Sequence, residues 1–70
     1  MNQEHPSEWC RIGSRWKLIG QEVWATVECI GECGDLWDIE LRYCDQNGFP
    51  NYSTLHAHSD SFQEDWEPAS

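Results

Sequence analysis

Two runs of alternating apolar and polar residues constrain the fold of this chain more than any other feature. Residues 23–30 read Val-Trp-Ala-Thr-Val-Glu-Cys-Ile, and residues 36–44 read Leu-Trp-Asp-Ile-Glu-Leu-Arg-Tyr-Cys. A period of two is the pattern of a β-strand that buries one face. Residues 31–35 between the runs are rich in turn-forming types, and a loop of this length is common in hairpins. The sequence therefore predicts an antiparallel hairpin over residues 23–44.

Pairing Ile30 with Leu36 predicts the register of this hairpin. The expected apolar face then pairs Cys29 with Trp37, Val27 with Ile39, Ala25 with Leu41, and Val23 with Tyr43. The expected polar face pairs Trp24 with Arg42, Thr26 with Glu40, and Glu28 with Asp38. Because a shift of one residue would mix the two faces, the pattern specifies the register strongly. Trp24 and Arg42 are then placed for a cation–π contact.

A third strand is expected over residues 52–58, and two registers are open for it. A two-residue turn at Asn47-Gly48 would set polar residues against the apolar face. A longer loop over residues 45–50 instead places Leu55 and Ala57 on the apolar face. Pro50 cannot donate a hydrogen bond to a strand ladder, which favours the longer loop. In that register His58 lies beside Asp38, and His56 lies beside Glu40.

The chain divides into a central β domain and two flanking segments. Residues 1–13 form an N-terminal segment that is loose or contains one helical turn, expected over residues 8–12 with Ser7 as its cap. Residues 14–58 form the antiparallel β domain, which begins with a short strand at 14–19. Residues 59–70 form an acidic C-terminal segment with a helical turn. There Ser61 to Glu64 fits a capping box, and Phe62 and Trp66 are spaced to anchor the turn on the sheet.

The size of the chain limits it to one small domain. A chain of 70 residues buries only about 60% of its unfolded surface. Its five Trp residues are expected mainly to fill the core. A few short strands with one apolar face must curl on themselves or pair with another copy. We therefore expect an all-β fold, a small antiparallel meander curled into a barrel.

Three segments resemble the strand–turn–strand pattern of Tudor and related SH3-like barrels. They are Gly20-Gln-Glu-Val-Trp-Ala25, Leu36-Trp-Asp-Ile-Glu-Leu41 and Tyr43-Cys-Asp-Gln-Asn-Gly48. The family has a Gly-x-x-Val/Cys-x-Ala strand, then an aromatic-led strand and an aromatic–Asp–x–Gly turn. It usually spreads the last two elements over two strands, whereas here they share one. The resemblance implies a Tudor-like barrel.

The same resemblance implies an aromatic cage that holds methylated Lys or Arg. The residue types are supplied by Trp24, Trp37, Tyr43 and Tyr52 with Asp45. The predicted pairing turns Trp37 and Tyr43 inward, so only Trp24 and Tyr52 are left for such a surface.

The charge balance restricts the classes of partner. The chain carries 13 acidic and 4 basic residues, a net charge of -9. Direct binding to nucleic acid needs Lys and Arg to displace counterions, so we expect none. We also expect no membrane span, because no apolar stretch approaches the required length, and no signal peptide. The expected location is the cytoplasm, with the four cysteines as reduced thiols.

The polar face of the predicted sheet is the first candidate site. It gathers three carboxylates and two imidazoles, with one indole as an apolar anchor: Glu28, Asp38, Glu40, His56, His58 and Trp24. Directly opposed like charges are destabilising, so Glu28 beside Asp38 invites an explanation. Such a face suits a basic protein surface, a divalent metal or a response to pH. We expect a non-enzymatic, small acidic protein-interaction module, an inhibitor or adaptor, with no cofactor.

Two alternatives remain open. Cys29 and Cys33 lie on a glycine-rich turn, which favours a small zinc-binding structural protein. Their spacing has three intervening residues where two are usual, and the remaining thiols, Cys10 and Cys44, would have to approach from elsewhere. The second alternative is a homo-oligomeric small β protein whose sheet edges or apolar faces pair, with its function elsewhere. No activated nucleophile or phosphate-binding loop is recognisable, so we expect no enzyme activity.

Overall fold

The computed structural model describes residues 5–69, except for the side chain of Ser7. The elements in chain order are η1 (Pro6–Glu8), β1 (Arg15–Leu18), β2 (Trp24–Cys33), β3 (Leu36–Cys44), β4 (Pro50–His58), α1 (Ser59–Asp65) and β5 (Trp66–Pro68). The expectations for residues 1–4, and for Ser7 as a cap, lie outside the described residues.

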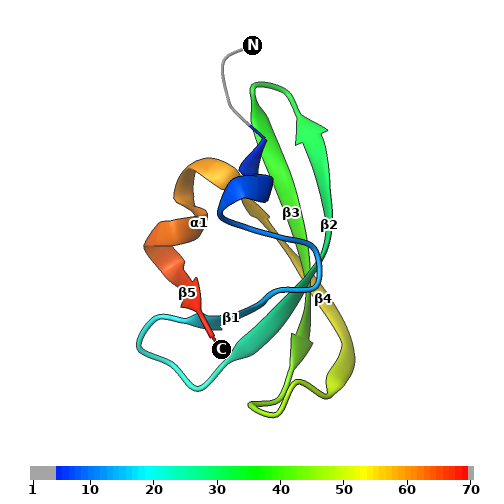
Figure 1. Ribbon diagram of the computed structural model, residues 1–70, viewed down its shortest axis with the longest axis vertical. Helices are drawn as coiled ribbons and strands as arrows, with labels where there is room; N and C mark the ends of the chain where they lie inside the picture. Colours follow the sequence, from blue (N-terminus) through cyan, green and yellow to red (C-terminus); the bar gives the residue numbers. More distant parts are fainter. Residues whose placement is uncertain (1–4, 70) are drawn as a thin grey trace.

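All five strands belong to one antiparallel sheet in the order β4-β3-β2-β1-β5. The prediction of a small antiparallel β domain is therefore confirmed. β4 and β5 form the two edges, so the sheet is not closed into a barrel. Figure 1 shows η1 and α1 on the same side of the sheet, with β1 and β5 crossing below them.

The core lies between the sheet and these helical segments. Its buried side chains are Cys10, Trp16, Ala25, Val27, Ile39, Leu41, Phe62 and Trp66. Phe62 has no exposed surface and is packed against Trp16, with ring centroids 4.9 Å apart, and against Trp66 at 6.2 Å. The expectation that Phe62 and Trp66 anchor the C-terminal segment on the sheet is confirmed.

The prediction of a five-residue loop between β2 and β3 is wrong. Cys33 pairs with Leu36, so the loop has only two residues, Gly34 and Asp35. Gly34 has a φ of 62°, a left-handed conformation that glycine adopts without strain. Two-residue hairpin turns with glycine first match the twist of the flanking strands, which is why this turn forms in place of the longer loop.

The predicted register of β2 on β3 is wrong as a consequence. Val27 pairs with Leu41, Cys29 pairs with Glu40, and a β-bulge at Glu28 lies between them. The extra residue reverses the alternation, so Ile30 pairs with Ile39 and packs against the core while Cys29 is exposed. Cys29 was expected on the apolar face. A regular two-residue alternation of apolar and polar residues does not predict a bulge.

The preferred register of the third strand is confirmed. Asp38 pairs with His58, and Glu40 pairs with His56. Leu55 and Ala57 pack against the core, as the longer loop required. The strand begins earlier than expected, because Pro50 already pairs with Cys44 across a second irregularity. β4 is an edge strand, where proline is tolerated.

The flanking segments differ from expectation in detail. The helical turn near the N-terminus is η1, earlier than residues 8–12, and Pro6 is buried. α1 begins after His58 and has no side-chain cap, so the capping box at Ser61 and Glu64 does not form. Residues 66–68 return to the sheet as β5 beside β1, which the sequence pattern did not predict.

Alanine substitutions at Gly34 and at Gly31 test the two-residue turn. Gly34→Ala should destabilise the protein by about 1–2 kcal/mol, because a Cβ is strained at a left-handed residue. Gly31 has an ordinary φ and no atom within 4 Å of an added Cβ, so Gly31→Ala should be neutral or stabilising. Urea unfolding followed by tryptophan fluorescence measures both. Equal losses for the two variants would contradict the observed register.

A matched pair of isoleucines tests the position of the core. Ile39 is fully buried, whereas Ile12 is 66% exposed. Ile39→Val should lower the free energy of unfolding by about 0.5–1.5 kcal/mol. Ile12→Val should change it by less than about 0.5 kcal/mol. The same urea titration reports both, and a larger loss at Ile12 than at Ile39 would contradict the assignment of the buried face.

Candidate functional site

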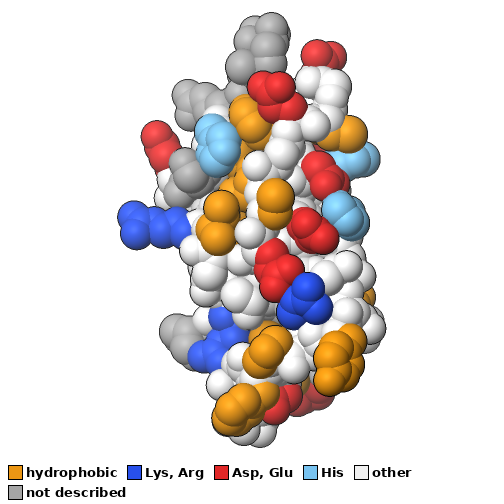
Figure 2. Space-filling model, turned by 90° about the vertical axis from the view of Figure 1, so that its right-hand side faces the viewer, with side chains coloured by type: hydrophobic (Ala, Val, Ile, Leu, Met, Phe, Trp, Pro, Cys, Tyr) orange, Lys and Arg blue, Asp and Glu red, His pale blue; other side chains and the backbone are white. Residues whose placement is uncertain are grey.

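The candidate site lies on the outer face, which we define as the surface of β2, β3 and β4 turned away from α1. Successive rows across it are Gly31–Asp38–His58, Cys29–Glu40–His56 and Thr26–Arg42–Thr54, with Glu28 at the bulge between the last two rows. Figure 2 shows acidic and histidine side chains gathered in a band on this side of the molecule. The five titratable residues predicted for the site thus share one face.

His56 links two carboxylates on this face. Its Nδ1 lies 2.6 Å from Asp38 Oδ2, and its Nε2 lies 3.9 Å from Glu40 Oε2. The pKa of His56 is raised above its usual value of 6.5, chiefly by the hydrogen bond to Asp38, then by the charge of Asp38, with a smaller contribution from Glu40. Both carboxylates attract the positive charge of a protonated imidazole, so this pair of acids favours the charged form.

Glu28 is not beside Asp38, and that expectation is wrong. The bulge displaces Glu28 along the strand, where its Oε2 accepts a hydrogen bond of 2.6 Å from Arg42 Nε. Arg42 also donates to the backbone carbonyl oxygens of Asn51 and Tyr52, at 3.1 and 3.2 Å. The like-charge conflict that the predicted register contained is therefore absent, and Arg42 ties three strands together.

Trp24 is not paired with Arg42 either. It lies opposite Lys17 on one side and Cys44 on the other, because the register is displaced by two residues at this end of β2. The cation over its ring is Lys17, with Nζ 5.9 Å from the ring centroid, in place of the expected Arg42. Thr26, expected opposite Glu40, lies opposite Arg42. Trp24 remains half-buried on the outer face, at its opposite end from Asp38.

The cysteines do not form a ligand cluster. Cys29 and Cys33 are both exposed, and the nearest ring nitrogen to Cys33 Sγ is His58 Nε2 at 3.9 Å. Cys10 is buried, and its burial raises the pKa of its thiol to about 11. Among residues 5–69, no three His, Cys, Asp or Glu side chains are grouped to hold a metal ion. The geometry of the described residues thus gives no support to the zinc alternative.

The aromatic cage implied by the family resemblance is not assembled. Asp45 uses its Oδ1 to accept hydrogen bonds of 2.9 Å from the backbone N–H groups of Asn47 and Phe49. Its carboxylate therefore holds the β3–β4 loop in shape. Tyr52 is fully exposed, and Trp37 is packed against His5 with ring centroids 4.6 Å apart. These aromatic side chains do not enclose a common space with Asp45.

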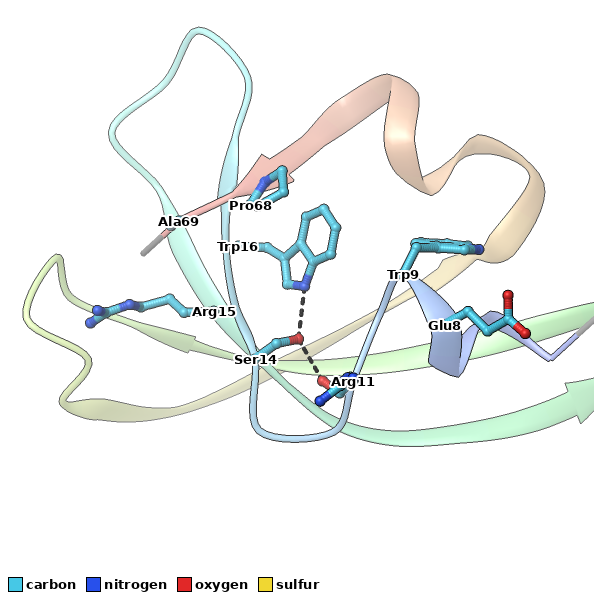
Figure 3. Close-up of a pocket in the computed structure, with 8 residues that line it drawn as sticks. All are labelled: Glu8, Trp9, Arg11, Ser14, Arg15, Trp16, Pro68 and Ala69. Carbon is cyan, nitrogen blue, oxygen red and sulfur yellow. Dashed lines mark hydrogen bonds between the residues drawn. The ribbon is translucent and has the colours of Figure 1, made fainter.

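A pocket that the sequence did not predict lies between the N-terminal segment and the end of β5. Its volume is about 420 Å³, and it is lined by Glu8, Trp9, Arg11, Ser14, Arg15, Trp16, Pro68 and Ala69. Figure 3 shows the indole of Trp16 held by a hydrogen bond of 3.0 Å to Ser14 Oγ, which in turn donates to the carbonyl of Arg11. The sequence signal for this pocket was that Arg11 and Arg15 lie close to Trp9 and Trp16 along the chain.

Comparisons with known proteins gave no match: no family model, no curated protein and no solved structure is similar to the chain. Within residues 5–69, no helix has the length and apolar character that crossing a membrane requires.

The environment of His56 predicts how its protonation, and with it the stability of the fold, depends on pH. By NMR titration, His56 should show a pKa above 6.5. Asp38→Asn should lower that pKa more than Glu40→Gln, because Asp38 supplies the hydrogen bond. The interaction stabilises the fold fully below about pH 6.5 and is lost as the pH rises through the raised pKa. An equal or larger effect of Glu40→Gln would contradict the observed pairing.

Proposed function

We propose that this protein is a non-enzymatic interaction module whose outer face binds a partner protein with a basic surface, as an inhibitor or adaptor does. The observation that carries the proposal is the composition of that face. Asp38, Glu40 and Glu28 stand in successive rows, and the only Lys or Arg side chain paired with any of them in the described part of the chain is Arg42. Asp38 and Glu40, which have no Lys or Arg partner among the described residues, favour a cationic partner.

The solvated setting of these acids supports binding over catalysis. The side chains of Asp38, Glu40 and Glu28 are 28%, 34% and 38% exposed. Exposed carboxylates can approach a partner at little desolvation cost, whereas general acid–base work relies on a positioned group in a water-excluded site. The histidines stand on the same open sheet surface, so we propose no enzyme activity.

Exposed aromatic side chains at the other end of β4 supply apolar contact area. Tyr52 is fully exposed and Phe49 is 69% exposed, and both precede the β4 residues that carry the histidines. Large exposed aromatics beside charged groups are common in protein interfaces, where they act as anchors. With half-buried Trp24, they extend the candidate surface beyond the acidic rows.

The strand order supports the finer proposal of an SH3-like build. The C-terminal strand β5 returns beside β1, and β2 is long enough to pair with both β1 and β3. A five-stranded antiparallel sheet over one core is compatible with a small barrel that stays open between β4 and β5. The four cysteines are free thiols, in keeping with a proposed location in the cytoplasm.

The edge of β4 is a less suitable contact surface than its face. β4 has nine residues, and its second edge pairs with no other described strand. However, Pro50 lies in the strand and an irregularity interrupts its pairing near Arg42, two devices that discourage pairing between sheet edges. We therefore place the partner on the outer face and not along the edge of a homo-oligomer.

Two matched triple variants test the proposal. One combines Glu28→Gln, Asp38→Asn and Glu40→Gln on the outer face, and the other combines Glu22→Gln, Asp60→Asn and Glu64→Gln at exposed sites elsewhere. Each removes three negative charges. Immobilised proteins are compared by quantitative mass spectrometry for capture from extracts of the source organism. A basic protein should be captured by the wild type and the control but about tenfold less, or 1.4 kcal/mol weaker, by the outer-face variant.

Salt dependence separates this outcome from general charge effects. Capture by the wild type should fall between about 0.1 and 1 M salt, as the Debye length shortens from about 10 to about 3 Å. Equal losses in the two triple variants would attribute binding to net charge alone and overturn the assignment of the face. Capture that is unchanged at high salt would overturn the electrostatic partner.

A further inference from the structure

The pocket at Trp9 and Trp16 lies apart from the acidic rows and has the opposite charge character. Three of the four Lys and Arg residues of the chain lie in β1 or just before it: Arg11, Arg15 and Lys17. Two of them, Arg11 and Arg15, line the pocket. In a chain with 13 acidic residues, this is a local reversal of charge at a concave site.

Arg11 and Arg15 have no acidic partner among residues 5–69. The ion pairs of residues 5–69 involve Arg42 and His56 but neither Arg11 nor Arg15. The Arg15 guanidinium extends to the β3–β4 loop, where it makes a long hydrogen bond of 3.4 Å to the Gln46 carbonyl, whereas Arg11 is exposed. Because Arg11 has no ion pair among the described residues, its guanidinium can bind a carboxylate in a planar, bidentate manner.

The floor of the pocket is aromatic and fixed in position. Trp16 is only 3% exposed, and its indole N–H is already bound to Ser14 Oγ. Trp9 packs edge-on against Trp16, with centroids 6.3 Å apart, and against Phe62 at 5.8 Å. Figure 3 shows Pro68 beside Trp16, and Glu8 and Arg15 at opposite ends of the pocket. The volume of about 420 Å³ is within the usual range for small-molecule sites, about 300–1,000 Å³.

We propose that this pocket binds a small aromatic carboxylate. The ring packs against Trp9, Trp16 and Pro68, and the carboxylate meets Arg11. Glu8 at the far end excludes a second negative group from that side. The site is independent of the partner-binding face, so it adds a ligand to the proposed function and does not rest on it.

Three ligands of one shape and different charge test the proposal. Phenylacetate, phenylacetamide and phenethylamine are titrated into ¹⁵N-labelled protein and followed by NMR. Phenylacetate should shift the indole N–H signals of Trp9 and Trp16 and the amide of Ala69, with a dissociation constant of about 1 mM or tighter. The neutral amide should bind about tenfold more weakly, and the amine should leave these signals unmoved.

Single-charge variants locate the cation that is responsible. Arg11→Gln should weaken phenylacetate binding about tenfold, whereas Lys17→Gln, which removes the same charge outside the pocket, should change it less than about twofold. Glu8→Gln should strengthen binding by removing the nearby negative charge. The dispersed spectrum of each variant verifies that it is folded.

Four results would overturn the proposal. They are absence of shifts at Trp9 and Trp16, equal affinity for the three ligands, equal losses in Arg11→Gln and Lys17→Gln, and unchanged or weaker binding in Glu8→Gln. None of them bears on capture of a basic protein by the outer face, so the two proposals fail separately.

Discussion

One extra residue in β2, Glu28, determines which side chains reach the core and which reach the outer face. Val27 and Ile30 are three apart, so in a regular strand they would point to opposite faces. The bulge lets both pack inward, against Leu41 and Ile39. Complete burial of such a side chain contributes about 1.5–3 kcal/mol, whereas one backbone hydrogen bond contributes about 0.5–1.5 kcal/mol net. Ile30 is only half-buried, so its burial contributes about half of that figure and is comparable to the hydrogen bond lost from the interrupted ladder. Because of the same bulge, Glu28 forms an ion pair with Arg42, and Asp38 and Glu40 both pair with His56.

The C-terminal segment, α1 and β5, depends on aromatic packing rather than on local propensity. α1 has seven residues and no side-chain cap, and a helix of that length is not stable alone. β5 has three residues. Both are held because Phe62 is enclosed by aromatic rings, with Trp16 at 4.9 Å and Trp9 at 5.8 Å. The same contacts fix the floor of the pocket, so the element that completes the sheet also shapes the second candidate site.

The alternation of apolar and polar residues was sufficient to predict that β2, β3 and β4 are antiparallel strands. It also predicted the pairing of β3 with β4, because Leu55 and Ala57 could be buried in only one register. It failed for β2 against β3, where Gly34 allows a two-residue turn and Glu28 forms a bulge. A strict two-residue alternation cannot predict where a strand contains an inserted residue. The pocket depends on contacts between segments more than fifty residues apart, such as Trp16 with Pro68, which no local pattern contains.

The outer face is divided by a row of cations, and this division bears on how a partner would sit. Arg15, Thr26 and Arg42 are partners on successive strands, so the two guanidinium-bearing residues are about 10 Å apart at the usual strand spacing. Asp38 and Glu40 lie on one side of this row. A basic surface would be attracted on that side and repelled at the row, which fixes its orientation as well as its position. A carboxylate bound at Arg11 would add a negative charge near one end of the row. Since screening acts over about 8 Å at physiological ionic strength, that change would extend the negative potential only locally, and the acidic rows would keep their own field.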